Sequence, residues 1–512
     1  MPSTSTRWEA AINHQPAGNI SASGPATASA VERFDVEPVN KREQRSLYKS
    51  RVKIHPKRVK GTFRTLKWWI MAVTLGIYYV TPWLRWDRGP GAPDQAVLID
   101  FPSRRFYFFF IEIWPQEVYY IAGLLIMAGI GLFLITSLVG RAWCGYMCPQ
   151  TVWTDLFLVV ERFIEGDRGQ RIRLDAASFT VGKAAKRTLK YVVWLLIAMG
   201  TGGAWVFYFA DAPTLARDLA VFQAPAAAYV TIGILTFTTF TLGGFMREQV
   251  CTYMCPWPRI QGAMMDEESL TVSYRADRGE PRAPYRKGES WESRGDCVDC
   301  KACVVSCPMG IDIRDGQQLE CITCALCIDA CDDVMAKIGR PRGLIDYDSV
   351  ATAVSRAKGE KKPVRLVRPR TILYASLWAM VGGIMLFVLL TRSDIDINVL
   401  RDRNPLFTRL SDGGIRNGFT FKVLNKARAQ RTFAIGATGV QGLRLTLVGA
   451  EGVDEATPHV TVGADRVQTF RLLVTSPPGA LKSDSAAVRF VLTDINTNKT
   501  AVYDSVLRGP EK

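Results

Sequence analysis

The chain has 512 residues, of which 48% are hydrophobic and 22% are charged, and this balance excludes a globally disordered protein. It carries 64 Lys and Arg residues against 48 Asp and Glu residues, so its formal net charge is +16, which indicates a nucleic-acid or membrane partner. Only three histidines occur and no CxxCH motif is present, which excludes covalently attached c-type haem.

The N-terminal region has two parts. Residues 1–40 are rich in Ser, Thr, Ala, Pro and Gly, and this composition predicts a disordered tail. Residues 41–67 hold eleven Lys or Arg residues and a single acid, Glu43, a net charge of +10 that is most of the whole excess. Because an apolar segment follows directly, the positive-inside rule predicts a basic cytoplasmic juxtamembrane segment and makes a nucleic-acid partner unnecessary.

Five apolar segments follow, and each has about the 20 residues that a helix needs to cross the hydrocarbon core. They predict a multidomain membrane protein with a five-helix α-helical transmembrane bundle. The segment Phe101–Trp114 carries three charges and is predicted to be interfacial rather than a sixth span. The spans cover 68–86, 118–139, 191–210, 224–245 and 372–390, so the region 68–271 holds helices 1 to 4 and 372–391 holds helix 5.

The basic residues also predict the orientation. Lys and Arg residues cluster before the spans that begin near 191 and 372, so both spans are predicted to start in the cytoplasm. Five spans that start inside end outside. Residues 141–190 and 246–371 are therefore predicted to be cytoplasmic, with 272–371 as the region that holds the ferredoxin-type segment, and 392–512 to lie on the far side of the membrane.

Eight of the twelve cysteines form two C-x2-C-x2-C-x3-C groups inside a segment of about 288–340. This spacing is typical of bacterial ferredoxins with two [4Fe–4S] clusters, in which the fourth Cys of each group binds the other cluster. A reducing cytoplasm disfavours disulfides, and zinc sites use paired CxxC knuckles instead. The prediction is one cluster on Cys297, Cys300, Cys303 and Cys331, and a second on Cys307, Cys321, Cys324 and Cys327. One departure is visible, because Asp332 stands where the second group usually has Pro.

The other four cysteines form a repeated C-x-Y-M-C-P motif at the cytoplasmic ends of two spans. If each motif is helical, its two cysteines share one face, and the intervening Met adds a soft thioether. Soft ligands select Cu(I), although four such thiols could also cycle between dithiol and disulfide, or be inert buried residues. The predicted copper-binding and catalytic residues are Cys144, Cys148, Cys251 and Cys255, with Met147 and Met254 as additional ligands.

Two further segments have recognisable patterns. Apolar residues recur at helical spacing over 152–164, which predicts an amphipathic helix that lies on the inner leaflet or packs on the ferredoxin segment. Residues 412–508 alternate apolar and polar residues between turn-forming residues, which predicts a small antiparallel β-sandwich of roughly 100 residues. His459 is predicted to be a surface strand residue.

The two C-x-Y-M-C-P motifs and the segment from Cys307 to Cys331 resemble the CcoG (FixG/RdxA) family, over about residues 45–510. This resemblance implies an iron–sulfur protein of the bacterial inner membrane whose C-terminal region, residues 392–512, is a periplasmic immunoglobulin-like β domain. It also implies a cytochrome c oxidase accessory protein that reduces Cu(II) to Cu(I). The implied partners are the lipid membrane, a cytosolic electron donor, a copper transporter or oxidase assembly factors, and cytochrome c oxidase subunits; nucleic acid is not among them, and a homodimer is compatible.

The residue patterns and the family resemblance together support three hypotheses about function. The leading hypothesis is an enzyme, a membrane cupric reductase that draws electrons from two [4Fe–4S] clusters and supports assembly of a cbb-type haem–copper oxidase. The second is a quinol-linked membrane electron-transfer subunit, which would have a quinone partner and no stoichiometric copper. The third is a non-enzymatic scaffold for oxidase assembly.

Overall fold

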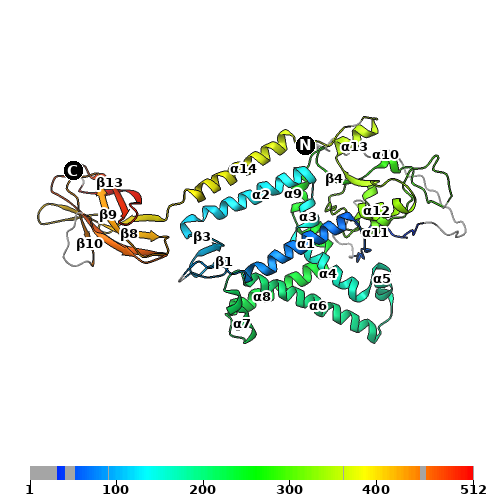
Figure 1. Ribbon diagram of the computed structural model, residues 1–512, viewed down its shortest axis with the longest axis horizontal. Helices are drawn as coiled ribbons and strands as arrows, with labels where there is room; N and C mark the ends of the chain where they lie inside the picture. Colours follow the sequence, from blue (N-terminus) through cyan, green and yellow to red (C-terminus); the bar gives the residue numbers. More distant parts are fainter. Residues whose placement is uncertain are drawn as a thin grey trace. The chain divides into compact units, whose positions relative to one another are not determined.

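A computed structural model describes residues 31–40, 52–89, 92–286, 288–360, 362–449, 457–481 and 483–510 of the chain. These residues form two compact units, one reaching to Asp87 and resuming over Pro93–Met385, and one made of Arg88–Ala92 and the chain from Leu386 onward. The first unit contains the apolar helices and the cysteine-rich segment, and the second is a β domain (Figure 1). Most of the predicted tail, residues 1–30, and residues 41–51 of the basic segment lie outside the described residues.

Four of the five predicted spans form helices that are long and apolar enough to cross a membrane. They are α2 (Tyr119–Val139), α6 (Val181–Val206), α8 (Ala226–Thr239) with its π-helical continuation Phe240–Met246, and α14 (Pro369–Leu390). The remaining predicted span corresponds to α1 (Thr62–Val80), which begins at Thr62 rather than at 68 and ends in a 3-10 turn over Thr81–Trp83. The charged residues Arg64 and Lys67 in its first turns lower its mean hydropathy.

The apolar helices pack in pairs. Helices α2 and α14 lie side by side (Figure 1), and the rings of Phe133 and Tyr374 face each other across this pair with centroids 6.5 Å apart. Helices α6 and α8 cross at Gly202, where an added Cβ would lie 2.9 Å from the carbonyl oxygen of Ile232. A small residue is therefore needed at this crossing, as is common where membrane helices approach closely.

As predicted, the segment between α1 and α2 does not form a sixth spanning helix. It forms a three-stranded antiparallel sheet of β1 (Val97–Asp100), β2 (Arg105–Phe108) and β3 (Ile111–Ile113). Short helices complete the connections between the long ones: α3 (Ala142–Tyr146), α5 (Arg168–Ala176), α7 (Ala212–Ala220) and α9 (Trp257–Met264).

The helix predicted over 152–164 is observed as α4 (Pro149–Glu165). It packs against α6 and the π-helical segment, with the ring of Phe157 stacked on Trp194 at 5.3 Å. The predicted apolar stripe is only partly buried, because Phe163 is 91% exposed. The buried face instead includes the carboxylates of Asp155 and Glu161, which an apolar pattern could not anticipate.

The cysteine-rich segment folds around two short strands and two helices. Strand β4 (Thr271–Tyr274) pairs antiparallel with β5 (Ile345–Asp348), and α11 (Ala302–Ser306) packs on α12 (Leu326–Lys337). Helices α10 (Ala276–Gly279) and α13 (Val350–Ala357) flank them.

The end of the predicted tail, residues 31–40, is ordered against the cysteine-rich segment. Val31 is buried in its core, and the amide of Phe34 donates to the carbonyl of Cys300 over 3.1 Å. The amide of Val39 donates to the carbonyl of Gly310 over 2.8 Å. Composition predicted disorder here because these residues bury apolar surface only against a segment that lies far along the chain.

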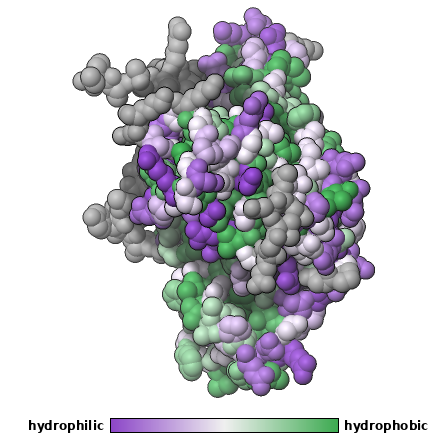
Figure 2. Space-filling model, turned by 90° about the vertical axis from the view of Figure 1, so that its left-hand side faces the viewer, coloured by the Kyte–Doolittle hydropathy of each residue, from purple (hydrophilic) through white to green (hydrophobic). Residues whose placement is uncertain are grey.

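The β domain is the predicted sandwich. One sheet has the order β10-β12-β8-β6 with β7 beside β8, and the other has the order β11-β9-β13-β14. Four phenylalanines, Phe419, Phe421, Phe433 and Phe490, are fully buried between the sheets. His459 is the first residue of β11, and its side chain is exposed, as predicted. Hydrophilic residues are spread among apolar ones over the face shown in Figure 2. The strands are β6 (Ile395–Arg401), β7 (Thr408–Arg409), β8 (Ile415–Asn425), β9 (Arg431–Thr438), β10 (Arg444–Leu447), β11 (His459–Val462), β12 (Arg466–Ser476), β13 (Ser485–Asp494) and β14 (Thr500–Arg508).

Candidate functional site

Two cavities in the cysteine-rich segment are lined by the predicted cysteine sets. The first, here called the far cavity, is lined by Cys297, Cys300, Cys303 and Cys331 together with Arg314 and Met335. The second, here called the near cavity, is lined by Cys307, Cys321, Cys324 and Cys327, and Cys303 also reaches it. The fold therefore brings the fourth cysteine of each sequence group to the cavity of the other group, which is the crossed arrangement that the spacing predicts.

The loops that carry these cysteines have the same backbone shape. Asp299 and Lys301 in the first loop, and Thr323 and Ala325 in the second, all adopt positive φ angles between 46° and 59°. These left-handed residues stand on either side of the middle cysteine of each loop, and a helix, α11 or α12, begins directly afterwards. Residues other than glycine seldom adopt this left-handed conformation, because it is strained and persists only where the surrounding structure enforces it. Such residues cluster at functional sites.

The helix that passes through Asp332 explains why the second group lacks its usual Pro. Helix α12 continues through Cys331 and Asp332 to Lys337, and the Asp332 carboxylate accepts the amide of Gly343 over 2.9 Å. Proline would interrupt such a helix. In the first group, by contrast, α11 ends at Ser306, and Cys307 is extended before Pro308, the conformation that proline imposes on its predecessor.

The chemistry of the cavity walls suits a metal-bound group. Burial raises the pKa of the Cys307 thiol to about 12 and that of the Cys321 thiol to about 11, because an apolar surrounding disfavours a thiolate unless a metal compensates its charge. Within the described residues, no three His, Cys, Asp or Glu side chains converge tightly enough to hold a single ion. Four thiols around a cavity fit a cluster of several atoms better than one zinc ion.

The two C-x-Y-M-C-P motifs have a different local structure from the one predicted. Cys144 lies in α3, but Cys148 is extended at the start of α4; Cys251 lies in the π-helical segment Val250–Met254, and Cys255 is extended after it. The prediction that each pair shares the face of one helix is therefore wrong. The reason is proline, since Pro149 and Pro256 move the preceding cysteine out of the helical conformation.

The two motifs are nevertheless structural repeats. Gly140 follows the last residue of α2 and has φ 58° and ψ −130°. Arg247 follows the π-helical segment Phe240–Met246 in the same way and has φ 44° and ψ −111°. Each stands four residues before the first cysteine of its motif. The repeat therefore includes an unusual chain reversal as well as the sequence letters, and at Arg247 a non-glycine residue adopts it.

The first cysteines of both motifs pack toward the near cavity. Cys144 belongs to a buried apolar group with Met309, Ile311, Ile322, Cys324 and Leu326, and Cys251, Cys307 and Cys321 pack against this group. The Cys144 thiol donates to Oε1 of the buried Gln261 over 3.1 Å. Burial, together with the charges of Cys148 and Cys144, raises the pKa of Cys251 to about 12.

The predicted methionine ligands lie away from this group. The side chains of Met147 and Met254 are 43% and 56% exposed. The motif cysteines likewise do not converge as tightly as a single ion requires, within the described residues. A copper site on these residues therefore stays a prediction, and it rests on the four thiols.

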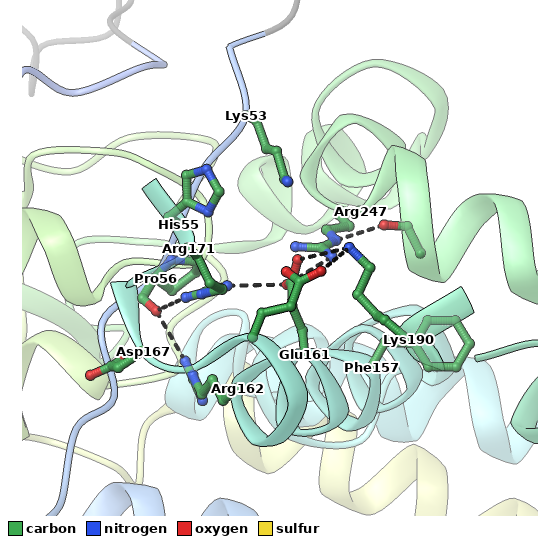
Figure 3. Close-up of polar contacts among 12 residues, drawn as sticks. Lys53, His55, Pro56, Phe157, Glu161, Arg162, Asp167, Arg171, Lys190 and Arg247 are labelled. Carbon is green, nitrogen blue, oxygen red and sulfur yellow. Dashed lines mark hydrogen bonds and ion pairs between the residues drawn. The ribbon is translucent and has the colours of Figure 1, made fainter. Parts of the chain in front are cut away.

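A buried ionic network, unpredicted from the sequence, joins the two motifs (Figure 3). Glu161 on α4, the helix that follows the first motif, is fully buried and pairs through Oε2 with Arg171 at 3.1 Å and with Arg247 at 3.0 Å. Lys190 lies 3.8 Å from the other oxygen and 2.9 Å from Glu165. Arg247 precedes the second motif, so this network ties the helix after one motif to the chain before the other.

The electrostatics of the network favour a permanently charged carboxylate. Burial alone would raise the pKa of Glu161, but the positive charges of Arg247, Arg171 and Lys190 outweigh burial and lower it to about 2. The only sequence signal was an acid inside an apolar helical stripe, which is a weak one because such residues are usually exposed.

The basic N-terminal segment contributes to the same network. The carbonyl of Pro56 accepts hydrogen bonds from Arg171 over 2.7 Å and from Arg162 over 3.4 Å. Burial and the charges of Lys53 and Arg171 lower the pKa of His55 to about 4, so the imidazole is neutral at pH 7. This segment thus has a structural role beside the topological one that its charge predicts.

Comparisons with known proteins match the chain over most of its length. Residues 246–350 match a family model described as a 4Fe-4S dicluster domain, 121–165 match a 4Fe-4S binding domain, and 385–510 match an IG-like fold at the C-terminal of FixG. The C-x-Y-M-C-P motif that begins at Cys144 lies in the 4Fe-4S binding domain match, 121–165. The motif that begins at Cys251 lies at the start of the dicluster domain match, 246–350.

Three curated relatives are similar over nearly the whole chain. The chain is 53% identical to the Nitrogen fixation protein FixG of Rhizobium meliloti, over 95% of this chain and 98% of that protein. It is 56% identical to Protein RdxA of Cereibacter sphaeroides, over 85% of this chain and 91% of that protein. It is 54% identical to Protein RdxB of the same organism, over 91% of this chain and 98% of that protein.

Proposed function

Because the chain belongs to the FixG/RdxA family of iron–sulfur membrane proteins, we propose that it is an oxidoreductase that reduces Cu(II) to Cu(I) at its paired cysteine motifs. In this proposal the reaction supports assembly of a cbb-type haem–copper cytochrome c oxidase. The observation that carries it is the packing of Cys144 and Cys251 on the apolar group that also contains Cys324. A soft-ligand site and a ferredoxin-type cysteine loop thereby share one buried contact.

The cysteines have two roles in this proposal. The sets lining the far and near cavities would each hold a [4Fe–4S] cluster, and such clusters supply one-electron transfer. The four motif thiols would hold copper, because soft thiolates favour Cu(I) over harder ions. Each Cu(II) gains one electron and becomes Cu(I), and the electron comes from a cytosolic donor through the cysteine-rich segment.

The proposed topology follows from charge. The basic segment runs into the first turns of α1, further basic residues lie in the first turns of α6, and others precede α14. All three helices would therefore start in the cytoplasm of a bacterial cell. With α1 as the fifth spanning helix, the cysteine-rich segment is cytoplasmic and the β domain is periplasmic. The β domain would then meet oxidase subunits or assembly factors, while the cysteine motifs open toward the cytoplasmic border.

Anaerobic Cu(II) reduction by the purified full-length protein tests the proposal. With reduced clusters, the wild-type protein is expected to reduce Cu(II), and a variant with Ser at Cys144, Cys148, Cys251 and Cys255 is expected to lose that activity while keeping its iron. Conversion of the exposed Met147 and Met254 to Leu is the matched control and is expected to have little effect. A four-Ser variant as fast as the wild type would remove the motif cysteines from the reaction.

The same preparation separates the alternatives. A quinol-linked electron-transfer subunit would carry quinone and no stoichiometric copper, so Cu(I) retained by the wild type and lost from the four-Ser variant would count against it. A scaffold would support oxidase maturation even when the four cysteines are replaced. Oxidase maturation in cells that carry the four-Ser variant therefore distinguishes a scaffold from a reductase.

A further inference from the structure

The two cysteine motifs are alike in sequence and differ in environment. Tyr146 of the first motif is 6% exposed, whereas Tyr253, its counterpart in the second, is 46% exposed. The residue after the first cysteine is Gly145 in one motif and Thr252 in the other. These differences mark the face of the first motif that the cysteine-rich segment covers.

Both a backbone carbonyl and a side-chain hydroxyl of the near-cavity loop take part in this contact. The Tyr146 hydroxyl donates to the carbonyl of Cys324 over 3.3 Å, and the amide of Arg141 donates to Oγ1 of Thr323 over 3.3 Å. The hydroxyl of Tyr347, on β5, donates to the carbonyl of Thr323 over 2.8 Å and lies 3.5 Å from the Tyr146 hydroxyl. The loop that carries Cys321 and Cys324 is thus hydrogen-bonded both to the first motif and to β5.

Gly145 permits the close approach. A Cβ added at Gly145 would lie 2.6 Å from the carbonyl oxygen of Ile322 and 3.1 Å from the amide nitrogen of Cys324. Both atoms belong to the backbone of the near-cavity loop, so neither can turn aside as a flexible side chain could. At the second motif this position carries a Cβ, and the Thr252 hydroxyl donates to the carbonyl of Glu248 in its own segment over 2.9 Å.

We propose that the first motif is the half of the cysteine site that receives electrons, docked on the near-cavity loop through Gly145 and Tyr146. Both are positioning residues, since they hold Cys144 beside Cys324 without supplying a ligand. The cysteines of the far cavity pack in another core, with Val298 and Met335, and Cys321 and Cys327 of the near cavity contact this core as well. Electrons from the cytosolic donor therefore enter at the far cavity, reach the near cavity, and leave toward Cys144.

This inference rests on the proposed function for the identity of the acceptor, Cu(II), but not for the docking contact itself. The test uses full-length protein, purified anaerobically in detergent, and two variants at equivalent positions, Gly145→Val and Thr252→Val. One readout is the electron paramagnetic resonance spectrum and midpoint potential of the reduced protein. The other is the rate at which Cu(II) reoxidises the reduced protein in a stopped-flow mixing experiment.

Gly145→Val is expected to shift the spectrum and potential of one reduced species, because cluster potentials depend on local hydrogen bonds and solvent exposure. It is expected to slow reoxidation by roughly tenfold or more, since displacing reacting groups by even 1 Å can cost that much. Thr252→Val is expected to leave the spectrum unchanged and to slow reoxidation far less. Equal effects of the two variants, or a larger effect of Thr252→Val, would overturn the proposal.

A milder pair covers the case in which Gly145→Val does not fold. Tyr146→Phe removes the hydroxyl that bonds to Cys324, and Tyr253→Phe removes the corresponding hydroxyl of the second motif. The first is expected to move the spectrum and the second is not; the reverse would again overturn the inference. If Cu(II) fails to reoxidise even the wild-type protein, the proposed function fails, and the spectra alone decide whether the first motif is the docked half.

Discussion

Arg247 occupies a backbone conformation that glycine occupies at the equivalent place in the first repeat. Holding a non-glycine residue there costs on the order of 1–3 kcal/mol. The side chain offsets this cost, because it pairs with Glu161 at 3.0 Å and donates from Nε to the carbonyl of Gly244 over 2.7 Å. The strain and the ion pair therefore belong together, and both precede the second cysteine motif.

Substitutions at Arg247 separate the two contributions. Arg247→Ala loses the ion pair and keeps the strained backbone, whereas Arg247→Gly loses the pair but relieves the strain. Thermal unfolding in detergent is expected to show that Arg247→Ala is less stable than Arg247→Gly by about 1 kcal/mol. Equal stability of the two variants would mean that the backbone at this position carries no strain.

Glu161 gives a prediction about pH. Its pKa is lowered from 4.5 to about 2 in the folded protein, so its ion pairs stabilise the protein fully above pH 4.5 and lose their effect as the pH falls from 4.5 toward 2. Glu161→Gln leaves Arg171 and Arg247 without their carboxylate, while Lys190 keeps Glu165, and it is expected to cost roughly 3–5 kcal/mol at pH 7.

Thermal unfolding between pH 7 and pH 3 measures both effects. The difference in stability between the wild type and Glu161→Gln is expected to shrink below pH 4.5. Glu292→Gln, on an exposed acid, is the control and is expected to follow the wild type throughout. A constant difference across this pH range would show that the charge of Glu161 is not what stabilises the network.

At the level of helices, α1 receives its N-terminal cap from a distant part of the chain. Its preceding residue, Gly61, makes no side-chain cap. Instead, the carboxylate of Asp329 on α12 accepts the amides of Phe63 over 3.2 Å and Arg64 over 2.7 Å. A carboxylate at a helix N-terminus accepts hydrogen bonds from amides that have no partner within the helix, and its negative charge interacts favourably with the helix dipole. Asp329 stands between Cys327 and Cys331, so the cap links α1 directly to α12, the helix that follows the second cysteine loop.

Hydrogen–deuterium exchange tests this cap. Asp329→Ala is expected to destabilise the first turn of α1 by about 1 kcal/mol, in line with the loss of other helix caps, and so to speed exchange there. Asp333→Ala, one turn further along α12, removes only an exposed pair with Lys337 and is the matched control. Unchanged exchange over Thr62–Leu66 in Asp329→Ala would show that the first turn does not depend on this carboxylate.

The elements that the sequence predicted well are those whose cause is local. Apolar segments of about 20 residues became α2, α6, α14 and the α8 run, and alternating residues became the sandwich strands, because a local pattern determines each of them. The prediction failed at Cys148 and Cys255, where helical spacing was assumed although Pro149 and Pro256 were visible in the sequence. The cap from Asp329 and the network around Glu161 could not be predicted, since each depends on a contact between distant segments.

The grouping of the cysteines into two sets was predictable because ferredoxin spacing is itself a local pattern. The docking of Gly145 on Ile322 was not, because a single glycine in a short motif has many explanations until its neighbours are known. The assignment of the cluster ligands stays a prediction until iron is measured, and two four-iron clusters correspond to eight iron atoms per chain.

For the molecule as a whole, the cysteines divide the chain into parts that respond differently to metal loss. The core of the cysteine-rich segment includes Cys297, Cys303 and Cys331, whereas the β-domain core from Ile395 to Leu507 contains no cysteine. Iron removal by a chelator under oxidising conditions is expected to speed amide exchange in the cysteine-rich segment, because metal binding and folding are coupled there. Strands β8 and β13 are expected to keep their protection; its loss would show that the β domain depends on the clusters.

The cap on α1 also bears on the order in which the protein is made. The amides that need Asp329 lie 265 and 266 residues before it, so α1 leaves the ribosome long before its cap exists. The apolar helices α2, α6 and α8 are synthesised in that interval. The first turn of α1 is therefore completed only after most of the chain has been translated, when the loop that carries Cys321 and Cys324 folds together with the helix α12 that follows it. Maturation of that loop thus becomes a late step that secures a helix made at the very beginning.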